Sequence, residues 1–416
     1  MNVSAFKNFG SSAPAQRACA FVVVVALLLL AFSSFSRRIP KSDQEAFLRP
    51  QVARSGRTQV PPPAAKPAAK SPASQAGQPK AARNAQAKSA AAAASLSPYY
   101  EHLSPELKQR TADLQKYTCK FTQDSIAPAT REHPQPVALV SLFSSSDKNV
   151  YKSYVLGLEV LGTSLGKHAP SSVQRIVMIL EGTACEAQCV QRLHDVGWKV
   201  CVAPKVTPPH PSNQARFRDQ FVKLVMWNMV QFERVVYLDS DTLAVGRLDR
   251  LLASKVDAQH PMAVAQDISG GRWVDGFNMG VAVIRTNASE FLRLYDLMRG
   301  GSVRYNEIMS EQGFLSEVYK GVWTRLKFED NANLAAFTDA RKKWNEKEAD
   351  IRLIHFTMEK GWNTHPGTAY YPVGKRWIDV KAVLCLRRCA AAALCSLAKA
   401  AGCECKTVDS NKCGGT

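Results

Sequence analysis

Residues 234–243, Arg-Val-Val-Tyr-Leu-Asp-Ser-Asp-Thr-Leu, constrain the fold of this chain most. Residues 235–238 are apolar or aromatic without interruption, which predicts a buried strand of a parallel sheet. Asp239 and Asp241 follow at the carboxyl end of that strand, where ligands of open α/β sheets bind. Alternate residues of an extended chain project to the same side, so both carboxylates can face one hard cation while Ser240 faces away. The sequence therefore predicts a divalent-metal site that holds a nucleotide diphosphate.

A D-x-D triplet is weak evidence on its own. Charged residues make up 21% of the 416 residues, so such triplets also arise by chance, and an acidic turn is the alternative interpretation. Two features favour the metal site: the apolar strand that ends on the triplet, and the polar motifs that follow it downstream.

Strand-like and helix-like segments alternate on both sides of this strand. We expect strands at 137–143, 175–180, 198–202, 262–265, 278–284, 323–326 and 351–356, and helices at 151–165, 185–196, 289–299 and 311–319. An apolar stripe predicts a further helix that ends near Phe232, just before the central strand. The alternation predicts an α/β fold with a doubly wound, mostly parallel sheet flanked by helices.

Residues 98–379 are expected to form the folded luminal domain, and the chain before them differs in composition. Residues 18–35 are an uncharged apolar or small-residue run, just long enough for a transmembrane helix. We interpret this run as a signal anchor preceded by a cytoplasmic tail, residues 1–17; a cleaved signal peptide is the alternative. Residues 36–97 are rich in Ala, Pro and Lys, which predicts a disordered stalk.

The cysteines indicate the compartment. Of eleven cysteines, Cys19 lies in the apolar run and the other ten follow it, as in proteins of an oxidising lumen. Asn287-Ala-Ser289 adds a glycosylation acceptor on the same side. We therefore expect a single-pass protein of the Golgi or ER membrane, with one N-terminal helix in the membrane and the rest in the lumen.

Residues 380–416 form a cysteine-rich tail. Its six cysteines favour three disulfides, for which fifteen pairings exist, and a zinc site is the alternative. The cysteine spacings lack two clean C-x-x-C pairs, which argues against zinc. We expect this tail to be an acceptor-binding or oligomerising appendix.

The net charge of +19 does not indicate a nucleic-acid partner. Eight Lys or Arg residues but only two acids, Asp43 and Glu45, lie between residues 42 and 97. Part of the basic charge thus belongs to the expected stalk, and we predict no nucleic acid among the partners.

Four motifs, taken together, resemble glycosyltransferase family 8, the glycogenin-like retaining enzymes. They are Asp239-Ser-Asp241, Asp275-Gly-Phe-Asn-Met-Gly280, Glu311-Gln-Gly313 and His355-Phe-Thr-Met-Glu-Lys-Gly-Trp362, in the family's order. The resemblance covers about residues 137–362. It implies a GT-A fold, a UDP-sugar donor, a manganese ion, and a glycan, lipid or protein acceptor that receives a hexosyl-type sugar.

The resemblance also assigns roles to individual residues. Asp239, Asp241 and His355 match the family's metal ligands, a set of oxygen and nitrogen donors that suits manganese. The positions that match its reaction centre are Glu311, Gln312 and Lys360. Those that match donor contacts, or flank them, are Leu142, Ser144, Tyr151, Lys223, Ser240, Asp267, Asp275, Asn278 and Gly361. The metal and the lysines would offset charge on the departing diphosphate, while the Gln312 and Asn278 amides orient the sugar.

The last motif departs from the family pattern at two points. Gly361 stands where proline is usual, and the stretch between His355 and Lys360 is one residue short. These changes affect how this motif binds the phosphates of the donor. A luminal binding protein that kept the fold and lost turnover is therefore one alternative.

A phosphatase is the other alternative. Residues 235–242 also have the form of the first motif of haloacid-dehalogenase-like phosphatases, an apolar strand followed by a nucleophilic aspartate, a second acid and a threonine. Such enzymes need a further acidic pair downstream, and the adjacent acids available are Glu329 and Asp330.

Overall fold

The computed structural model describes residues 104–122, 136–144, 148–183, 185–212, 214 and 217–400. The expected cytoplasmic tail (residues 1–17), signal anchor (18–35) and stalk (36–97) lie outside the described residues. The described part of the expected domain begins with a capped helix at residue 104. Among the residues described, no helix combines the length and the apolar character that crossing a membrane requires.

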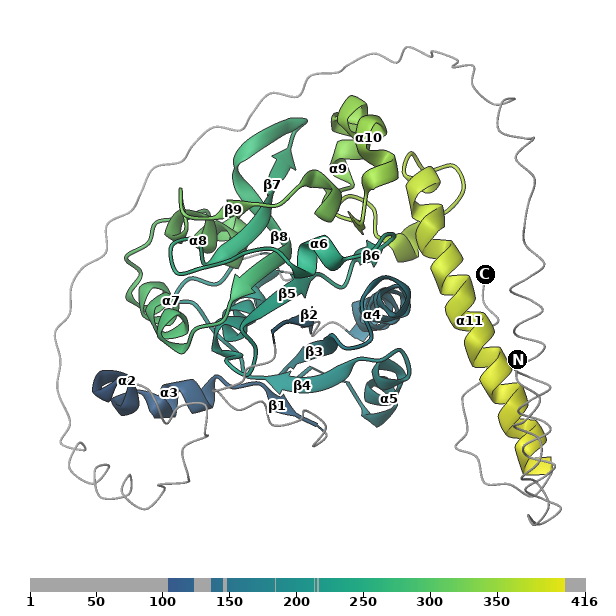
Figure 1. Ribbon diagram of the computed structural model, residues 1–416, viewed down its shortest axis with the longest axis horizontal. Helices are drawn as coiled ribbons and strands as arrows, with labels where there is room; N and C mark the ends of the chain where they lie inside the picture. The colour runs from purple at the N-terminus through teal and green to yellow at the C-terminus, as the bar shows by residue number, and fades with distance from the viewer. Residues whose placement is uncertain are drawn as a thin grey trace, which may run out of the picture. The chain divides into compact units, whose positions relative to one another are not determined.

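The described domain is built on a mixed α/β core with one large sheet (Figure 1). Its eight strands lie in the order β1-β4-β3-β2-β5-β8-β7-β9. In chain order they are β1 (Lys120–Phe121), β2 (Ala138–Phe143), β3 (Gln174–Leu180), β4 (Lys199–Ala203), β5 (Arg234–Leu238), β7 (Met262–Ser269), β8 (Arg272–Arg285) and β9 (Thr324–Arg325).

Strand direction in this sheet follows the expectation in part. β4, β3, β2 and β5 run parallel to one another. β8 is antiparallel to both β5 and β7, so β7 and its parallel neighbour β9 again run in the direction of β5. β1 is antiparallel to β4. β8 is much longer than expected because it forms a hairpin with β7, and this antiparallel insertion makes the sheet mixed.

Helices cover both faces of the sheet, which the strand sequence explains. α4 (Lys148–His168), α5 (Ala187–Asp195) and α6 (Asp249–Leu252) lie on one side; η5 (Gln220–Asn228), α7 (Ala288–Gly300) and α8 (Ser310–Val318) lie on the other (Figure 1). In β5, Val235 and Tyr237 join the core on one face, and Val236 and Leu238 join the core on the other. An uninterrupted apolar strand thus packs on both sides.

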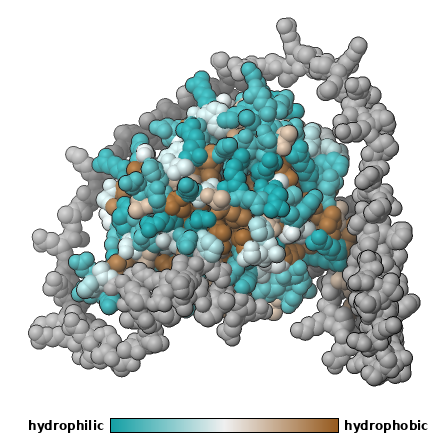
Figure 2. Space-filling model, viewed as in Figure 1, coloured by the Kyte–Doolittle hydropathy of each residue, from teal (hydrophilic) through white to brown (hydrophobic). Residues whose placement is uncertain are grey.

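A smaller sheet places the end of the domain beside the tip of β5. β6 (Thr242–Ala244) pairs antiparallel with β11 (Leu353–His355), which pairs parallel with β10 (Ala332–Asn333). The core behind this sheet also contains residues of α9 (Ala335–Asp339), α10 (Arg341–Lys347) and α11 (Tyr371–Ala400). Hydrophilic side chains cover most of the visible face, with apolar ones gathered across its middle (Figure 2).

Two expected features differ in the structure. The helix expected to end near Phe232 is the 3₁₀ helix η5, which ends at Asn228; residues 221–228 are all buried, so this segment packs on every side instead of along one stripe. The expected tail boundary at residue 380 falls inside α11, so the helix continues from the domain into the cysteine-rich segment.

The N-terminal part of the domain is anchored by a capped helix and a disulfide. Ser104 accepts a hydrogen bond from Leu107 N at the start of α2 (Pro105–Gln109), and α3 (Thr111–Lys116) follows. Cys119 is bonded to Cys201 of β4. A second disulfide, between Cys185 and Cys189, closes the start of α5. In the tail, Cys395 is disulfide-bonded, and Cys403, Cys405 and Cys413 lie outside the described residues.

Candidate active site

Two acids and a distant histidine converge at the tip of β5. Asp239 directly follows β5, and Asp241 directly precedes β6. The antiparallel pairing of β6 with β11 places His355 opposite Thr242, beside these acids. His355 Nε2 lies 3.3 Å from Asp241 Oδ1 and 3.7 Å from Asp239 Oδ2. Strand pairing thus joins residues that are more than a hundred positions apart in the sequence.

A glycine makes room for the imidazole. Gly280 of β8 lies against the His355 ring, and a Cβ built on it would be 1.9 Å from the ring's Cε1 atom. Gly280 O also accepts a hydrogen bond of 2.8 Å from Asp239 N. Gly280 therefore allows the His355 ring and Asp239 to lie next to each other.

The donor set fits a divalent metal ion. One ligand atom each from Asp239, Asp241 and His355 lies within 4.8 Å of the others. Two carboxylates and one imidazole are ligands that manganese and related divalent ions accept. Asp241 and His355 are buried, 8% and 3% exposed, so the two are held by packing rather than free in solvent. The structure brings these three side chains together, as the resemblance implies.

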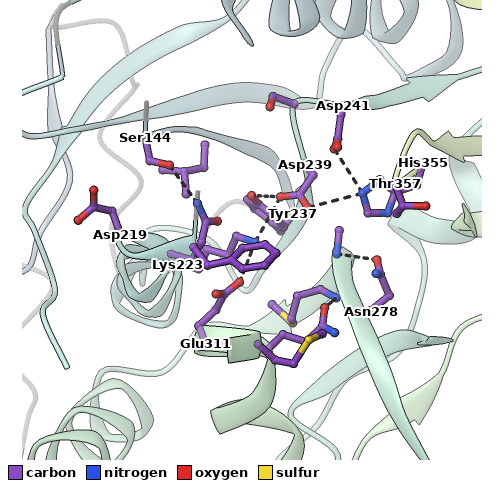
Figure 3. A pocket seen from close by; sticks show the side chains of 18 of the residues that line it. Ser144, Asp219, Lys223, Tyr237, Asp239, Asp241, Asn278, Glu311, His355 and Thr357 are labelled. Carbon is purple, nitrogen blue, oxygen red and sulfur yellow. Dashed lines mark hydrogen bonds and ion pairs between the residues drawn. The ribbon is translucent and has the colours of Figure 1, made fainter. Parts of the chain in front are cut away.

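A buried lysine connects Asp239 to the expected reaction centre. Lys223 of η5 is 3% exposed, and its Nζ lies 2.8 Å from Glu311 Oε1 and 3.3 Å from Asp239 Oδ1. It also lies over the Tyr237 ring, 4.8 Å from the centroid, and the Tyr237 hydroxyl donates to Asp239 Oδ1 (Figure 3). Burial would lower the pKa of Lys223, but the charges of Asp239 and Glu311 outweigh it and the pKa is raised. Lys223 is therefore a fixed cation at the base of the site.

Lys360 supplies a second cation, which is paired with Asp241. Its Nζ donates to Asp241 Oδ2 and, at 3.1 Å, to Phe356 O. Burial tends to lower the pKa of Lys360, but the Asp241 charge outweighs it and raises the pKa. Burial likewise opposes ionisation of Asp241, yet Lys360 and His355 together hold the pKa of Asp241 well below its usual range. Both groups stay charged at neutral pH.

Amide groups surround a third carboxylate, Asp267. Its Oδ1 accepts from Asn278 Nδ2 at 3.3 Å and from Asn333 Nδ2 at 3.1 Å, and its Oδ2 accepts from Gln312 Nε2 at 3.1 Å. Gln312 Oε1 in turn accepts from Met279 N. These bonds fix the orientation of Asp267 and of both amides. Glu311, next to Gln312, is buried, and burial raises its pKa against the opposing charge of Lys223.

These groups line one cavity of about 440 Å³ (Figure 3). The sequence-predicted residues in its lining are Leu142, Ser144, Lys223, Asp239, Ser240, Asp241, Asp267, Asn278, Glu311, Gln312, His355 and Lys360. Ser144 Oγ accepts from Gln220 Nε2 at 3.1 Å, which places Ser144 at the η5 side of the cavity. The cavity volume is in the range of small-molecule sites, and its lining combines apolar and charged groups.

Three predicted residues do not line the cavity. Tyr151 packs against Phe143, with ring centroids 5.4 Å apart, and belongs to the core around α4. Asp275 is exposed on β8, in a stretch where the register of β8 against β7 shifts. Gly361 is buried beneath Trp377 of α11.

Other lining residues were not predicted. Tyr154 lines the cavity and lies one helical turn after Tyr151 on α4. Tyr237 was assigned only to the strand, although its position two residues before Asp239 puts both on one side. The remaining unpredicted lining residues are Phe217, Asp219, Gln220, Met279, Gly280, Met309 and Thr357. Met279, Gly280 and Thr357 lie inside two of the four motifs but were not assigned a role, and the other four residues belong to none of these motifs.

Comparison with known proteins now assigns the family. The family model of glycosyl transferase family 8 matches residues 149–365, just over half of the chain and including all three metal-ligand candidates. The chain belongs to glycosyltransferase family 8. The acidic pair that a phosphatase would need, Glu329 and Asp330, does not line the cavity. Asp330 forms an ion pair with Arg250, and Glu329 lies near Lys347.

Curated relatives of this family 8 protein share about a quarter of their aligned residues with it. Glycogenin of Neurospora crassa is 26% identical over 216 residues, which cover 50% of this chain and 30% of the relative. Inositol phosphorylceramide glucuronosyltransferase 1 of Arabidopsis thaliana is 24% identical over 56% of this chain and 44% of the relative. The chain thus spans less than half the length of each.

Solved structures give weaker similarity to this family 8 chain. The galactosyltransferase LgtC, in complex with donor and acceptor sugar analogues, matches with a TM-score of 0.40 and 16% identity over 59% of this chain and 95% of that one. The apo form of the glycosyltransferase GlyE of Streptococcus pneumoniae matches with a TM-score of 0.42 and 17% identity over 59% of this chain and 62% of that one.

Proposed function

We propose that this protein is a metal-dependent retaining glycosyltransferase that moves a hexosyl-type sugar from a UDP-sugar to an acceptor. The observation that carries the proposal is the convergence of Asp239, Asp241 and His355 within 4.8 Å, in a cavity that also contains Lys223 and Lys360. We further propose a GT-A donor site and manganese as the ion, as expected for the family. The acceptor is a glycan, lipid or protein.

Different residues of the cavity would have different roles in such a transfer. Asp239, Asp241 and His355 would hold the ion, which when bound would offset negative charge on a diphosphate leaving group. Lys360, which is paired with Asp241, would add a second positive charge for the leaving group. Leu142 and Ser144, at the η5 side of the cavity, would contact the nucleoside. Asp267, Asn278 and Gln312 would orient the sugar, because their hydrogen bonds already fix their polar groups.

An oxidising compartment is part of the proposal. The disulfides Cys119–Cys201 and Cys185–Cys189 support a location in the Golgi or ER lumen, where such bonds form and persist. Attachment to the membrane through residues 18–35 remains part of this proposal as well.

A panel of UDP-sugars scored by UDP release, with and without Mn²⁺, tests the function. We expect Mn²⁺-dependent release with at least one donor, and loss of that release in Asp241→Ala. Donor turnover that persists after chelation of divalent metals, or that Asp241→Ala leaves intact, would contradict the proposal. UDP binding without turnover of any donor would instead favour a binding protein that has lost activity.

A further inference from the structure

The segment that carries Lys360 is packed against a tryptophan from the C-terminal helix. Residues 361–363 form the short 3₁₀ helix η9 (Gly361–Asn363), directly after Lys360. Trp377 of α11 is 2% exposed and covers Gly361. A Cβ built on Gly361 would lie 2.4 Å from Trp377 Cγ, so no larger residue fits while the indole is in place. The contact accounts for a glycine at this position.

The same segment is held from its other side by α4. The Trp362 ring lies 5.1 Å from the ring of Tyr154, which lines the cavity, and 6.4 Å from the ring of Trp377. Gly157 of α4 gives Trp362 its space, because a Cβ there would lie 2.7 Å from the Trp362 ring. Trp362 is therefore enclosed between α4 and α11.

The first part of α11, residues 371–388, is itself fixed to α4. Glu159 of α4 is 0% exposed and accepts from Arg388 of α11 and from Arg192 of α5, the latter through bonds of 2.5 and 2.7 Å. Nearer the start of α11, Gly374 packs against Thr364, where a Cβ would lie 2.3 Å from Thr364 Oγ1. A buried carboxylate with two guanidinium partners is a strong geometric constraint, because losing either partner leaves charge poorly compensated.

The arrangement matters because glycine leaves the backbone after Lys360 free to adopt many conformations. Lys360 must keep its Nζ at one place, beside Asp241, to act on a diphosphate. Because residue 361 is glycine and not proline, no pyrrolidine ring restrains the backbone at this position. The restraint comes from tertiary packing instead, through the Trp377 indole.

We propose that α11 is a brace for the diphosphate-binding segment and that Trp377 is a positioning residue that acts through Gly361 on Lys360. The inference rests on the proposed function, since it assigns Lys360 to the nucleotide diphosphate. It extends that function by making the C-terminal helix, outside the residues matched by the family model, part of the donor site.

Binding of UDP to the full-length protein in saturating Mn²⁺, measured by isothermal titration calorimetry, tests the brace. Trp377→Ala should weaken UDP binding about 10-fold, the scale seen when a group that orients a ligand-binding residue is lost. Gly361→Ala should weaken it by a similar factor, because the new methyl group displaces the segment from the indole. The matched control is Trp344→Ala: Trp344 is 0% exposed and belongs to the same apolar core as Trp377, but its ring contacts are with Phe328 and Phe337.

The double variant Gly361→Ala/Trp377→Ala separates positioning from general loss of packing. Without the indole the methyl group has space, so Gly361→Ala should cost little in the Trp377→Ala background. Independent, multiplicative losses would overturn the brace, as would wild-type UDP affinity in Trp377→Ala or an equal loss in Trp344→Ala. If Trp377→Ala does not fold, Trp377→Phe replaces it, and unchanged UDP affinity in Gly361→Ala alone is enough to overturn the proposal. Failure of the wild-type protein to bind UDP would instead overturn the proposed function, and the brace with it.

Discussion

The cavity contains two kinds of carboxylate, and their surroundings differ. Asp239 and Asp241 face cationic or ligand-type groups: His355, Lys223 and Lys360. Asp267 faces neutral amides, from Asn278, Asn333 and Gln312. The first group has oxygens directed at a shared point that an ion can occupy. The second has oxygens that already accept hydrogen bonds from fixed donors, so its orientation is set without a cation.

The difference shows that the function of a carboxylate in this cavity depends on the groups around it. Carboxylates clustered near one another repel unless a cation joins them, so the Asp239–Asp241 pair favours a metal. A carboxylate that is surrounded by amides needs no cation. The following predictions test whether the two regions are separable in function.

Loss of a metal-ligand acid should have the largest effect. Asp241→Ala should lower Mn²⁺-dependent kcat/KM about 10³-fold, because it removes one of three protein ligands and the partner of Lys360. The measurement is UDP release under steady-state conditions. Asp249→Ala, which removes an exposed acid paired with Arg247, is the control and should leave the rate unchanged. A loss of less than 10-fold in Asp241→Ala would remove Asp241 from the metal site.

Removing the lysine that joins Asp239 to Glu311 should mainly lower stability. Lys223→Met leaves Glu311 buried without its cation, which should reduce the free energy of unfolding by about 3–5 kcal/mol. Denaturant unfolding monitored by circular dichroism measures it. The double variant Lys223→Met/Glu311→Gln should recover part of the loss, because it removes the uncompensated charge. If the single variant is as stable as wild type, the Lys223–Glu311 pair does not hold the site together.

Asp267→Asn should separate orientation of the sugar from binding of the nucleotide. The new amide places N–H donors against the donors of Asn278, Asn333 and Gln312, so the network rearranges. We expect kcat to fall about 10²-fold while the affinity for UDP in Mn²⁺ stays near wild type. Equal losses in kcat and in UDP affinity would show that the two regions act as one.

The smallest expected effect comes from the hydroxyl that orients Asp239. Tyr237→Phe removes a hydrogen bond to Asp239 Oδ1 and should weaken Mn²⁺ binding by about 1 kcal/mol, roughly 5-fold. Tyr319→Phe is the matched control, since Tyr319 is a buried tyrosine whose hydroxyl donates to Glu290, outside the cavity. A Mn²⁺ affinity that changes equally in both variants would rule out a specific role for Tyr237.

The sequence predicts the parts of this site that depend on local pattern. An apolar run that ends in Asp239 and Asp241 is sufficient for the strand and its two acids, and the α/β alternation predicts helices on both faces of the sheet. Placement of His355 came from resemblance to the family. Its physical cause, the pairing of β11 with β6, is a contact between distant segments that no local pattern reveals.

The mispredicted details all depend on non-local packing. The helix phase that puts Tyr154 rather than Tyr151 at the cavity depends on how α4 packs on the sheet. The segment η5 is buried along residues 221–228, which a one-sided apolar stripe does not indicate. Gly361, which looked like a defect in the phosphate-binding motif, is complementary to Trp377 sixteen residues later.

The most direct test of the account is a Mn²⁺ titration of the wild-type protein and of His355→Ala, followed by electron paramagnetic resonance of the free ion. We predict one Mn²⁺ site per chain in the wild type and an affinity lower by at least about 10-fold in His355→Ala. Equal Mn²⁺ affinity in the two proteins would contradict the claim that His355 closes the same ion site as Asp239 and Asp241.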